Sequence, residues 1–145
     1  MGNTVGSKFF FRTVEDFYIL GLWLADGYWR SGSIGLTSVN PRLINRFSQF
    51  FLRVASGNPI KERIYEVDGI SKRKQKAFQM YINNRSLTRL FMATKTEALS
   101  VPKRYLLAYL AGRIDGDGHV DVKHRSGIRI AYSSREDALR DQKLF

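Results

Sequence analysis

The chain has 145 residues, of which 43% are hydrophobic, so it is long enough and apolar enough for one modest globular domain with a core. Its 24 lysines and arginines against 13 acidic residues give a net charge of +11. This surplus favours nucleic acid as a partner over an acidic membrane, because no basic amphipathic helix stands out. The sequence contains no membrane-length apolar run, no signal peptide and no cysteine, which predicts an intracellular protein, cytoplasmic or organellar, without disulfides.

The first predicted element is a helix that ends in Asp26-Gly27. Thr13 is a plausible N-cap, and Gly27 fits the left-handed position that stops a helix. Gly21 and Ala25 lie four residues apart, so they share one face of this helix. Such a strip of small side chains would let a second helix approach closely.

Two β-hairpins are predicted in the segment that follows. The first joins strands at 28–30 and 33–38 through the turn signal Ser31-Gly32. The second joins strands at 60–67 and 77–83. Alternation along these strands directs apolar residues to a core and polar residues to the opposite face.

The polar face of the predicted strands suits the major groove of a nucleic-acid duplex, where such side chains can read base edges. Its members are Arg30, Ser33, Thr37, Lys61, Arg63, Tyr65, Gln79, Tyr81 and Asn83. The connection at 71–76, SKRKQK, adds a basic loop suited to phosphate contact, although an ordinary solvated hairpin tip explains it equally well. The candidates in this loop are Lys72, Arg73, Lys74 and Lys76.

Two further helices accompany the second hairpin. The one before it has Asn40 as N-cap and Pro41 in its first turn, and Gly57 is expected to end it. Ser86 is the expected cap of the helix that follows the hairpin. Apolar residues recur at helical spacing in both, so each should cover the core.

The last third of the chain repeats the first motif. A helix is predicted with Ser100 as a possible N-cap, and its run Leu110–Gly118, LAGRIDGDG, again ends in Asp-Gly. Alignment of Asp117 with Asp26 gives an offset of 91 residues (117 − 26 = 91). The small residues then coincide, with Gly112 opposite Gly21 and Gly116 opposite Ala25. We therefore expect the two helices to pack on each other, in parallel, along these strips.

Parallel packing would make Asp26 and Asp117 neighbours at the negative ends of two helix dipoles. An anion is disfavoured there, and two like charges at close range add to the penalty. A divalent cation between them would relieve it, since carboxylate oxygens are the usual Mg²⁺ ligands. The alternative is that each aspartate is a solvated turn residue beside glycine, but the matched placement of the two favours a metal site.

The two motifs resemble those of the LAGLIDADG homing endonucleases. Leu110–Gly118 matches that nine-residue name at seven positions and departs at Arg113 and Gly116. Ile19–Gly27, ILGLWLADG, matches at five positions. A double match within one chain is a specific signal, and the resemblance covers nearly the whole chain from Glu15 onward.

The resemblance implies a site-specific endonuclease that hydrolyses double-stranded DNA with Mg²⁺. Asp26 and Asp117 would be catalytic metal ligands, and the backbone carbonyls of Ala25 and Gly116 would assist them. It also implies an α+β fold, in which an αββαββα repeat over 1–100, with an N-terminal arm, forms an antiparallel saddle-shaped sheet. Residues 101–145 would form a partial second repeat.

This second repeat is predicted to contain strands at 119–123 and 128–133 and a helix that begins at Arg135. Arg129 and Ser133 are its candidate DNA contacts. Its last hairpin and helix are missing, so we expect the N-terminal part of a longer or split protein, with a complementary C-terminal fragment or a second chain as partner.

Other site chemistries find little support. The alternating acids from Asp115 onward lack the Gly and Glu of an EF-hand, and the two histidines form no zinc pattern. The rival function is a non-cleaving nucleic-acid binder on the same fold, such as an RNA splicing maturase or a DNA-binding regulator. Retention of both Asp26 and Asp117 favours the nuclease, because a binder does not need them.

Overall fold

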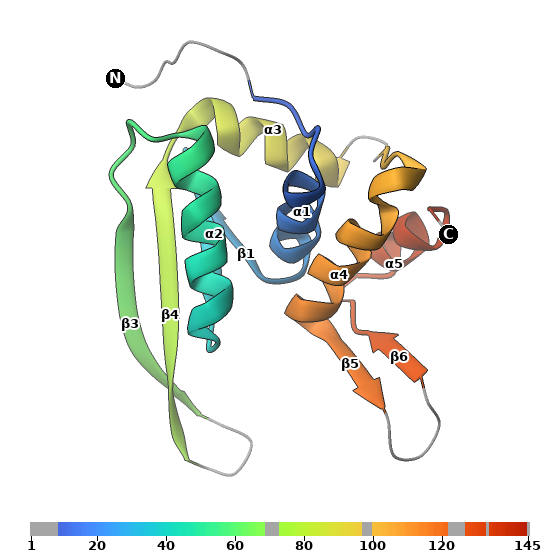
Figure 1. The fold of residues 1–145 in the computed structure, drawn as a ribbon. Coiled ribbons are helices and arrows are strands. Elements are labelled where there is room, and N and C mark those ends of the chain that lie inside the picture. The colour runs from blue at the N-terminus through green and yellow to red at the C-terminus, as the bar shows by residue number, and fades with distance from the viewer. Residues whose placement is uncertain (1–8, 69–72, 97–99, 122–126, 133, 145) are drawn as a thin grey trace. The chain divides into compact units, whose positions relative to one another are not determined.

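The computed structural model of the chain describes residues 9–68, 73–96, 100–121, 127–132 and 134–144 (Figure 1). The fold is α+β, as predicted from the sequence. The chain divides into two compact units, one of Met1–Phe10 with Gly27–Arg89 and the other of Phe11–Asp26 with Leu90–Phe145. The two motif helices therefore belong to the same unit, although the segment between them in sequence largely forms the other.

The first unit contains a four-stranded antiparallel sheet in the order β1-β2-β4-β3. Its strands are β1 (Gly27–Arg30), β2 (Ser33–Ser38), β3 (Lys61–Asp68) and β4 (Lys74–Asn83). Both predicted hairpins are confirmed, and Ser31 in the first turn has a φ of 54°, in the left-handed region that glycine usually occupies. The strand β4 begins three residues earlier than predicted, so Lys74 and Lys76 are strand residues rather than loop residues.

Helix α2 (Pro41–Val54) packs on one face of this sheet, against β2 and β4 (Figure 1). Its predicted N-cap is confirmed, because the side chain of Asn40 accepts a hydrogen bond of 3.0 Å from the amide of Arg42. The helix ends at Val54, before the predicted stop at Gly57. The core of the unit gathers the buried residues Ile34, Leu36, Phe47, Phe50, Phe51, Met80 and Ile82.

Helix α3 (Arg85–Thr96) is capped by Asn84, not by Ser86 as predicted. The Asn84 Oδ1 accepts a 2.9 Å hydrogen bond from the amide of Leu87, and the Nδ2 of Asn84 donates to Asn58 Oδ1 at 3.0 Å. Ser86 instead falls inside the first turn, where its side chain is exposed. The loop residue Asn58 thus holds the side chain of the capping residue.

The second unit holds both motif helices, α1 (Val14–Asp26) and α4 (Leu106–Asp117), which lie side by side (Figure 1). Thr13 caps α1 as predicted, since its Oγ1 accepts from the amide of Asp16 at 3.1 Å and the Asp16 carboxylate accepts in return from the amide of Thr13. The predicted Ser100 cap is wrong, because a short 3₁₀ turn, Lys103–Tyr105, precedes α4.

The second unit continues with a two-stranded antiparallel sheet of β5 (Gly118–Asp121) and β6 (Gly127–Ile130), followed by helix α5 (Arg135–Gln142). Each motif helix runs directly into a strand, so Gly27 and Gly118 open strands instead of serving as left-handed stops. No helix among the described residues is long and apolar enough to cross a membrane.

We predict that Asn84→Ala lowers the free energy of unfolding by about 1 kcal/mol, the usual cost of losing a side-chain N-cap. Ser86→Ala is the matched control, and we expect a change within about 0.5 kcal/mol because this side chain is exposed and caps nothing. Urea unfolding of the two variants measures both values. Equal losses would contradict the assignment of the cap to Asn84.

Candidate functional site

The motif helices touch backbone to backbone along the predicted small-residue strips. A Cβ atom added to Gly21 would lie 2.1 Å from the carbonyl oxygen of Tyr109, and one added to Gly112 would lie 2.0 Å from the carbonyl oxygen of Tyr18. Further along, a Cβ on Gly116 would lie 2.4 Å from the Cβ of Ala25. The contacts advance together along both helices, so the packing is parallel, and the predicted interface is confirmed.

This packing brings Asp26 and Asp117 together, each as the last residue of its helix. Burial, the nearby charge of Asp117 and a hydrogen bond between the two side chains raise the pKa of Asp26 to about 7. Burial also raises the pKa of Asp117, although the hydrogen bond from Asp26 and the positive charge of Arg113 act in the opposite direction. Burial and the neighbouring carboxylate therefore favour the neutral form of Asp26 below about pH 7.

The acid pair fits a hard divalent cation. Its donors are carboxylate oxygens, which Mg²⁺ prefers, and the raised pKa values show that burial disfavours the ionised carboxylates, a cost that a bound cation would offset. In the part of the chain that the structure describes, no cluster of three or more His, Cys, Asp or Glu side chains could hold a metal. The remaining ligands of such an ion would be carbonyls, water or substrate oxygens, as expected for Mg²⁺. The participation of the Ala25 and Gly116 carbonyls stays a prediction.

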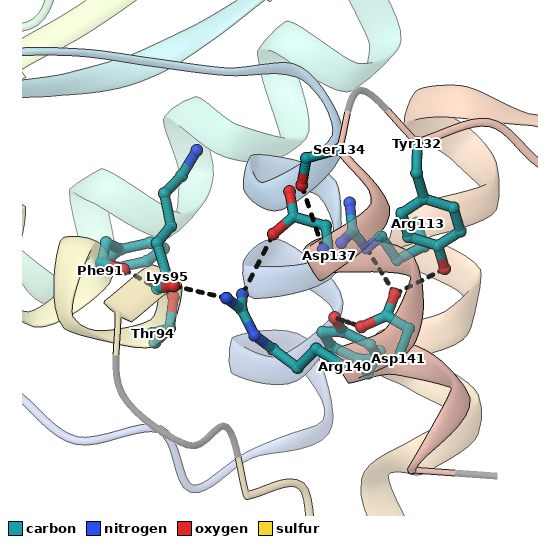
Figure 2. Close-up of polar contacts among 10 residues, drawn as sticks. Phe91, Thr94, Lys95, Arg113, Tyr132, Ser134, Asp137, Arg140 and Asp141 are labelled. Carbon is teal, nitrogen blue, oxygen red and sulfur yellow. Dashed lines mark hydrogen bonds and ion pairs between the residues drawn. The ribbon is translucent and has the colours of Figure 1, made fainter.

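Sequence reasoning missed a buried polar network that joins the motif helix α4 to α5. Asp141 of α5 accepts hydrogen bonds from Arg113 Nε at 2.8 Å and from Tyr132 at 2.7 Å (Figure 2). It also accepts one from Tyr109 at 2.5 Å. Arg113 and Asp141 are 2% and 1% exposed, and the guanidinium of Arg113 lies 4.7 Å from the centre of the Tyr132 ring. This ion pair explains why arginine is tolerated where the motif otherwise has leucine.

A second connection holds α5 to the end of α3. Arg140 donates a hydrogen bond to the backbone carbonyl of Lys95 and lies 3.5 Å from the carboxylate of Asp137 (Figure 2). The side chain of Ser134 caps α5 by accepting from the amide of Asp137 at 3.1 Å. Helix α5 is therefore anchored on both α4 and α3, although its apolar content is low.

Two tyrosines at equivalent positions of the two repeats could have indicated the buried polar contacts from the sequence. Tyr109 follows Tyr18 by 91 residues (109 − 18 = 91), the offset of the repeat. Tyr18 donates a 2.6 Å hydrogen bond to Asp115, which ties α1 to α4, whereas Tyr109 donates to Asp141. One phenol therefore ties α4 to α1, and the other ties α4 to α5.

The polar strand residues gather on one face of the sheet in the first unit, as the strand register requires. Thr37 pairs with Gln79 and Gln79 with Arg63 across three neighbouring strands. The same face carries Arg30, Ser33, Lys61, Tyr65, Tyr81 and Asn83. It is the face opposite to the one that buries Met80 and Ile82, so it remains accessible.

Contrary to the sequence prediction, the basic segment at 71–76 is not entirely a loop. Lys74 and Lys76 pair with Asp68 and Glu66, on the face opposite to the polar surface, and Lys74 lies 3.7 Å from Glu66. Only Arg73 among the described residues keeps the expected exposed loop position. Lys72 and Ser133 lie outside the described residues, and Arg129 is exposed on β6.

Residues 14–92 match the family described as the LAGLIDADG-like domain, which is 79 residues (92 − 14 + 1 = 79) of the 145. The crystal structure of I-DmoI, a LAGLIDADG homing endonuclease, in complex with DNA and Mn matches with a TM-score of 0.58 and 17% identity. That match covers 90% of this chain and 75% of I-DmoI. The complex of I-DmoI with DNA and Ca gives a TM-score of 0.60 at 17% identity, with 90% and 69% coverage. These matches show the shared fold.

A relative by sequence is a component of the A-type ATP synthase of Methanopyrus kandleri, which is 29% identical over 111 residues. The matched region is 73% of this chain but only 10% of that protein. The chain thus spans about a tenth of the length of this relative.

We predict that Gly112→Ala lowers the free energy of unfolding by about 1–3 kcal/mol or more, because the added methyl group meets backbone on α1 that cannot move aside. Gly57→Ala is the control, since a Cβ there has nothing within 4 Å. Thermal unfolding of both variants tests the contact. An unchanged melting curve for Gly112→Ala would show that the two helices do not touch at this residue.

We predict that Asp26→Asn raises the melting temperature at pH 8 but not at pH 4, measured in EDTA. The folded-state pKa of Asp26 is raised from 3.8 to about 7, so stability is full below 3.8 and is lost as the pH rises through 7. Asparagine removes the charge and therefore this loss. Glu62→Gln, which removes an exposed carboxylate, is the control and should show no such pH dependence. A gain of equal size at both pH values would contradict the pairing.

Proposed function

Because the chain belongs to the family of LAGLIDADG-like domains, we propose that it is a Mg²⁺-dependent endonuclease that cleaves double-stranded DNA at a specific site. The observation that carries this proposal is the pair of Asp26 and Asp117 at the ends of two parallel helices. A fold gains no stability from two desolvated acids in contact, so their presence calls for a function. The net charge of +11 and the exposed polar sheet face add support for a DNA substrate.

Each part of the site has a role in this proposal. Asp26 and Asp117 hold the cation, and the backbone contact at Gly21 and Gly112 fixes the distance between their helices. A bound Mg²⁺ would supply charge stabilisation at a phosphodiester and a water of lowered pKa. The network around Asp141 ties α4, the helix that carries Asp117, to α5.

DNA recognition falls to the polar face of the sheet in this proposal. Side chains of the kinds found on this face read base edges in the major groove. Arg73, Arg129 and Lys61 suit contact with the phosphates. Lys74 and Lys76, on the other face, contribute through long-range attraction more than through groove contact. A complementary fragment or a second chain stays a prediction, which light scattering with such a fragment would test.

The rival function is a non-cleaving nucleic-acid binder on the same fold. One observation favours it, namely that the described residues contain no group of three or more His, Cys, Asp or Glu side chains that could hold a metal. The acid pair weighs more, because a binder would have no use for a carboxyl group whose pKa is raised to about 7.

We predict that the protein cleaves members of a plasmid library of candidate sites in Mg²⁺ and that Asp117→Asn reduces the rate at least about a hundredfold, the scale for removing one preorganised electrostatic group. Affinity for DNA should change little. Asp115→Asn is the matched control, since Asp115 lies two residues before Asp117 and accepts a hydrogen bond from Tyr18 rather than from Asp26. Binding without cleavage by the unaltered protein would favour the rival function, and full cleavage by Asp117→Asn would overturn the site.

A further inference from the structure

The polar face of the sheet is organised by hydrogen bonds between neighbouring strands. Three side chains able to read bases each have a hydroxyl partner. Gln79 Nε2 donates to Thr37 Oγ1 at 3.1 Å, Ser33 Oγ donates to Asn83 Oδ1 at 2.6 Å, and Arg63 Nη2 donates to Tyr81 Oη at 3.4 Å. The hydroxyl groups therefore limit which donors and acceptors the amide and guanidinium groups have left for a ligand.

The pair of Thr37 and Gln79 is the best defined of the three. The two residues face each other directly in the register of β2 and β4, and both are half-buried. Threonine is branched at Cβ and has few χ1 rotamers, so its hydroxyl is a stiff anchor. A free glutamine would lose rotamer entropy on binding, whereas Gln79 has already lost part of it in the free protein.

The hydrogen bond to Thr37 leaves Gln79 with one unused N–H and with its Oε1 acceptor. In the major groove, only adenine presents a donor beside an acceptor, at N6 and N7. Guanine presents two acceptors, cytosine one donor, and thymine an acceptor beside a methyl group. Adenine is therefore the base that satisfies both remaining groups of Gln79.

We propose that Thr37 and Gln79 form an adenine-reading subsite for duplex DNA, in which Gln79 contacts the base and Thr37 is the positioning residue. This inference rests on the proposed DNA-binding function. It divides the polar face into side chains that touch bases and side chains that orient them. The neighbouring pair of Ser33 and Asn83 presents a different pattern, because Ser33 donates to the acceptor of Asn83 and leaves both N–H donors and one lone pair of Oδ1.

The test is selection from a randomised DNA duplex library in EDTA, so that binding is measured without cleavage. We expect the unaltered protein to prefer adenine at one base pair about tenfold or more, as bidentate contacts do. Gln79→Met should remove this preference. Thr37→Val, which keeps the shape but lacks the hydroxyl, should reduce it to about twofold, and Thr37→Ser should retain it.

Two measurements separate positioning from a merely structural role. The salt dependence of binding to unselected DNA should be the same for Thr37→Val and the unaltered protein, because phosphate contacts are unchanged. The melting temperatures of the two proteins should also be the same. Ser33→Ala is the matched control, which should change preference at another base pair and leave the adenine position intact.

The outcomes distinguish the inference from the function on which it rests. If the protein binds and cleaves DNA but Thr37→Val keeps the full adenine preference, the positioning role is wrong while the proposed function stands. If Gln79→Met leaves every preference unchanged, the subsite is wrong. If the unaltered protein binds no duplex, the proposed function and the inference both fail.

Discussion

The constraint on which the geometry of the candidate site depends is the backbone contact between α1 and α4. Gly21 and Gly112 each face a carbonyl oxygen of the other helix at a distance that no Cβ could occupy. Because the helices run parallel and end together, this contact brings Asp26 and Asp117 into contact as well. The arrangement that suits a cation is thus produced by packing several residues away from it.

An acid pair at two helix ends costs stability, and other contacts of the second unit offset that cost. Asp141 joins Arg113 and Tyr109 in a buried network between α4 and α5. Removing one partner of a buried ion pair typically costs about 3–5 kcal/mol, because the other charge is left alone. The network therefore makes the position of α4 specific, which a pair of closely placed carboxylates requires.

In the sheet of the first unit, the alternation of side chains along each strand determines which residues are exposed. One face buries Ile34 and Met80, so the other face must carry the polar residues. Cross-strand pairs such as Thr37 with Gln79 then fix the orientation of long side chains before any ligand arrives. Preorganisation of this kind improves discrimination between bases because less entropy is lost on binding.

The sequence by itself determined the helices and hairpins, the repeat and the meeting of Asp26 with Asp117, because these follow from periodicity, turn residues and the spacing of small side chains. Tertiary structure decided the rest. Lys74 belongs to β4 because this strand begins three residues earlier than the turn signals indicate, and strand alternation then places it on the face of Met80, opposite to Gln79. The tertiary structure also decided the pairing of Arg113 with Asp141. No local pattern encodes such a contact between two helices, because it exists only once the chain has brought distant residues together.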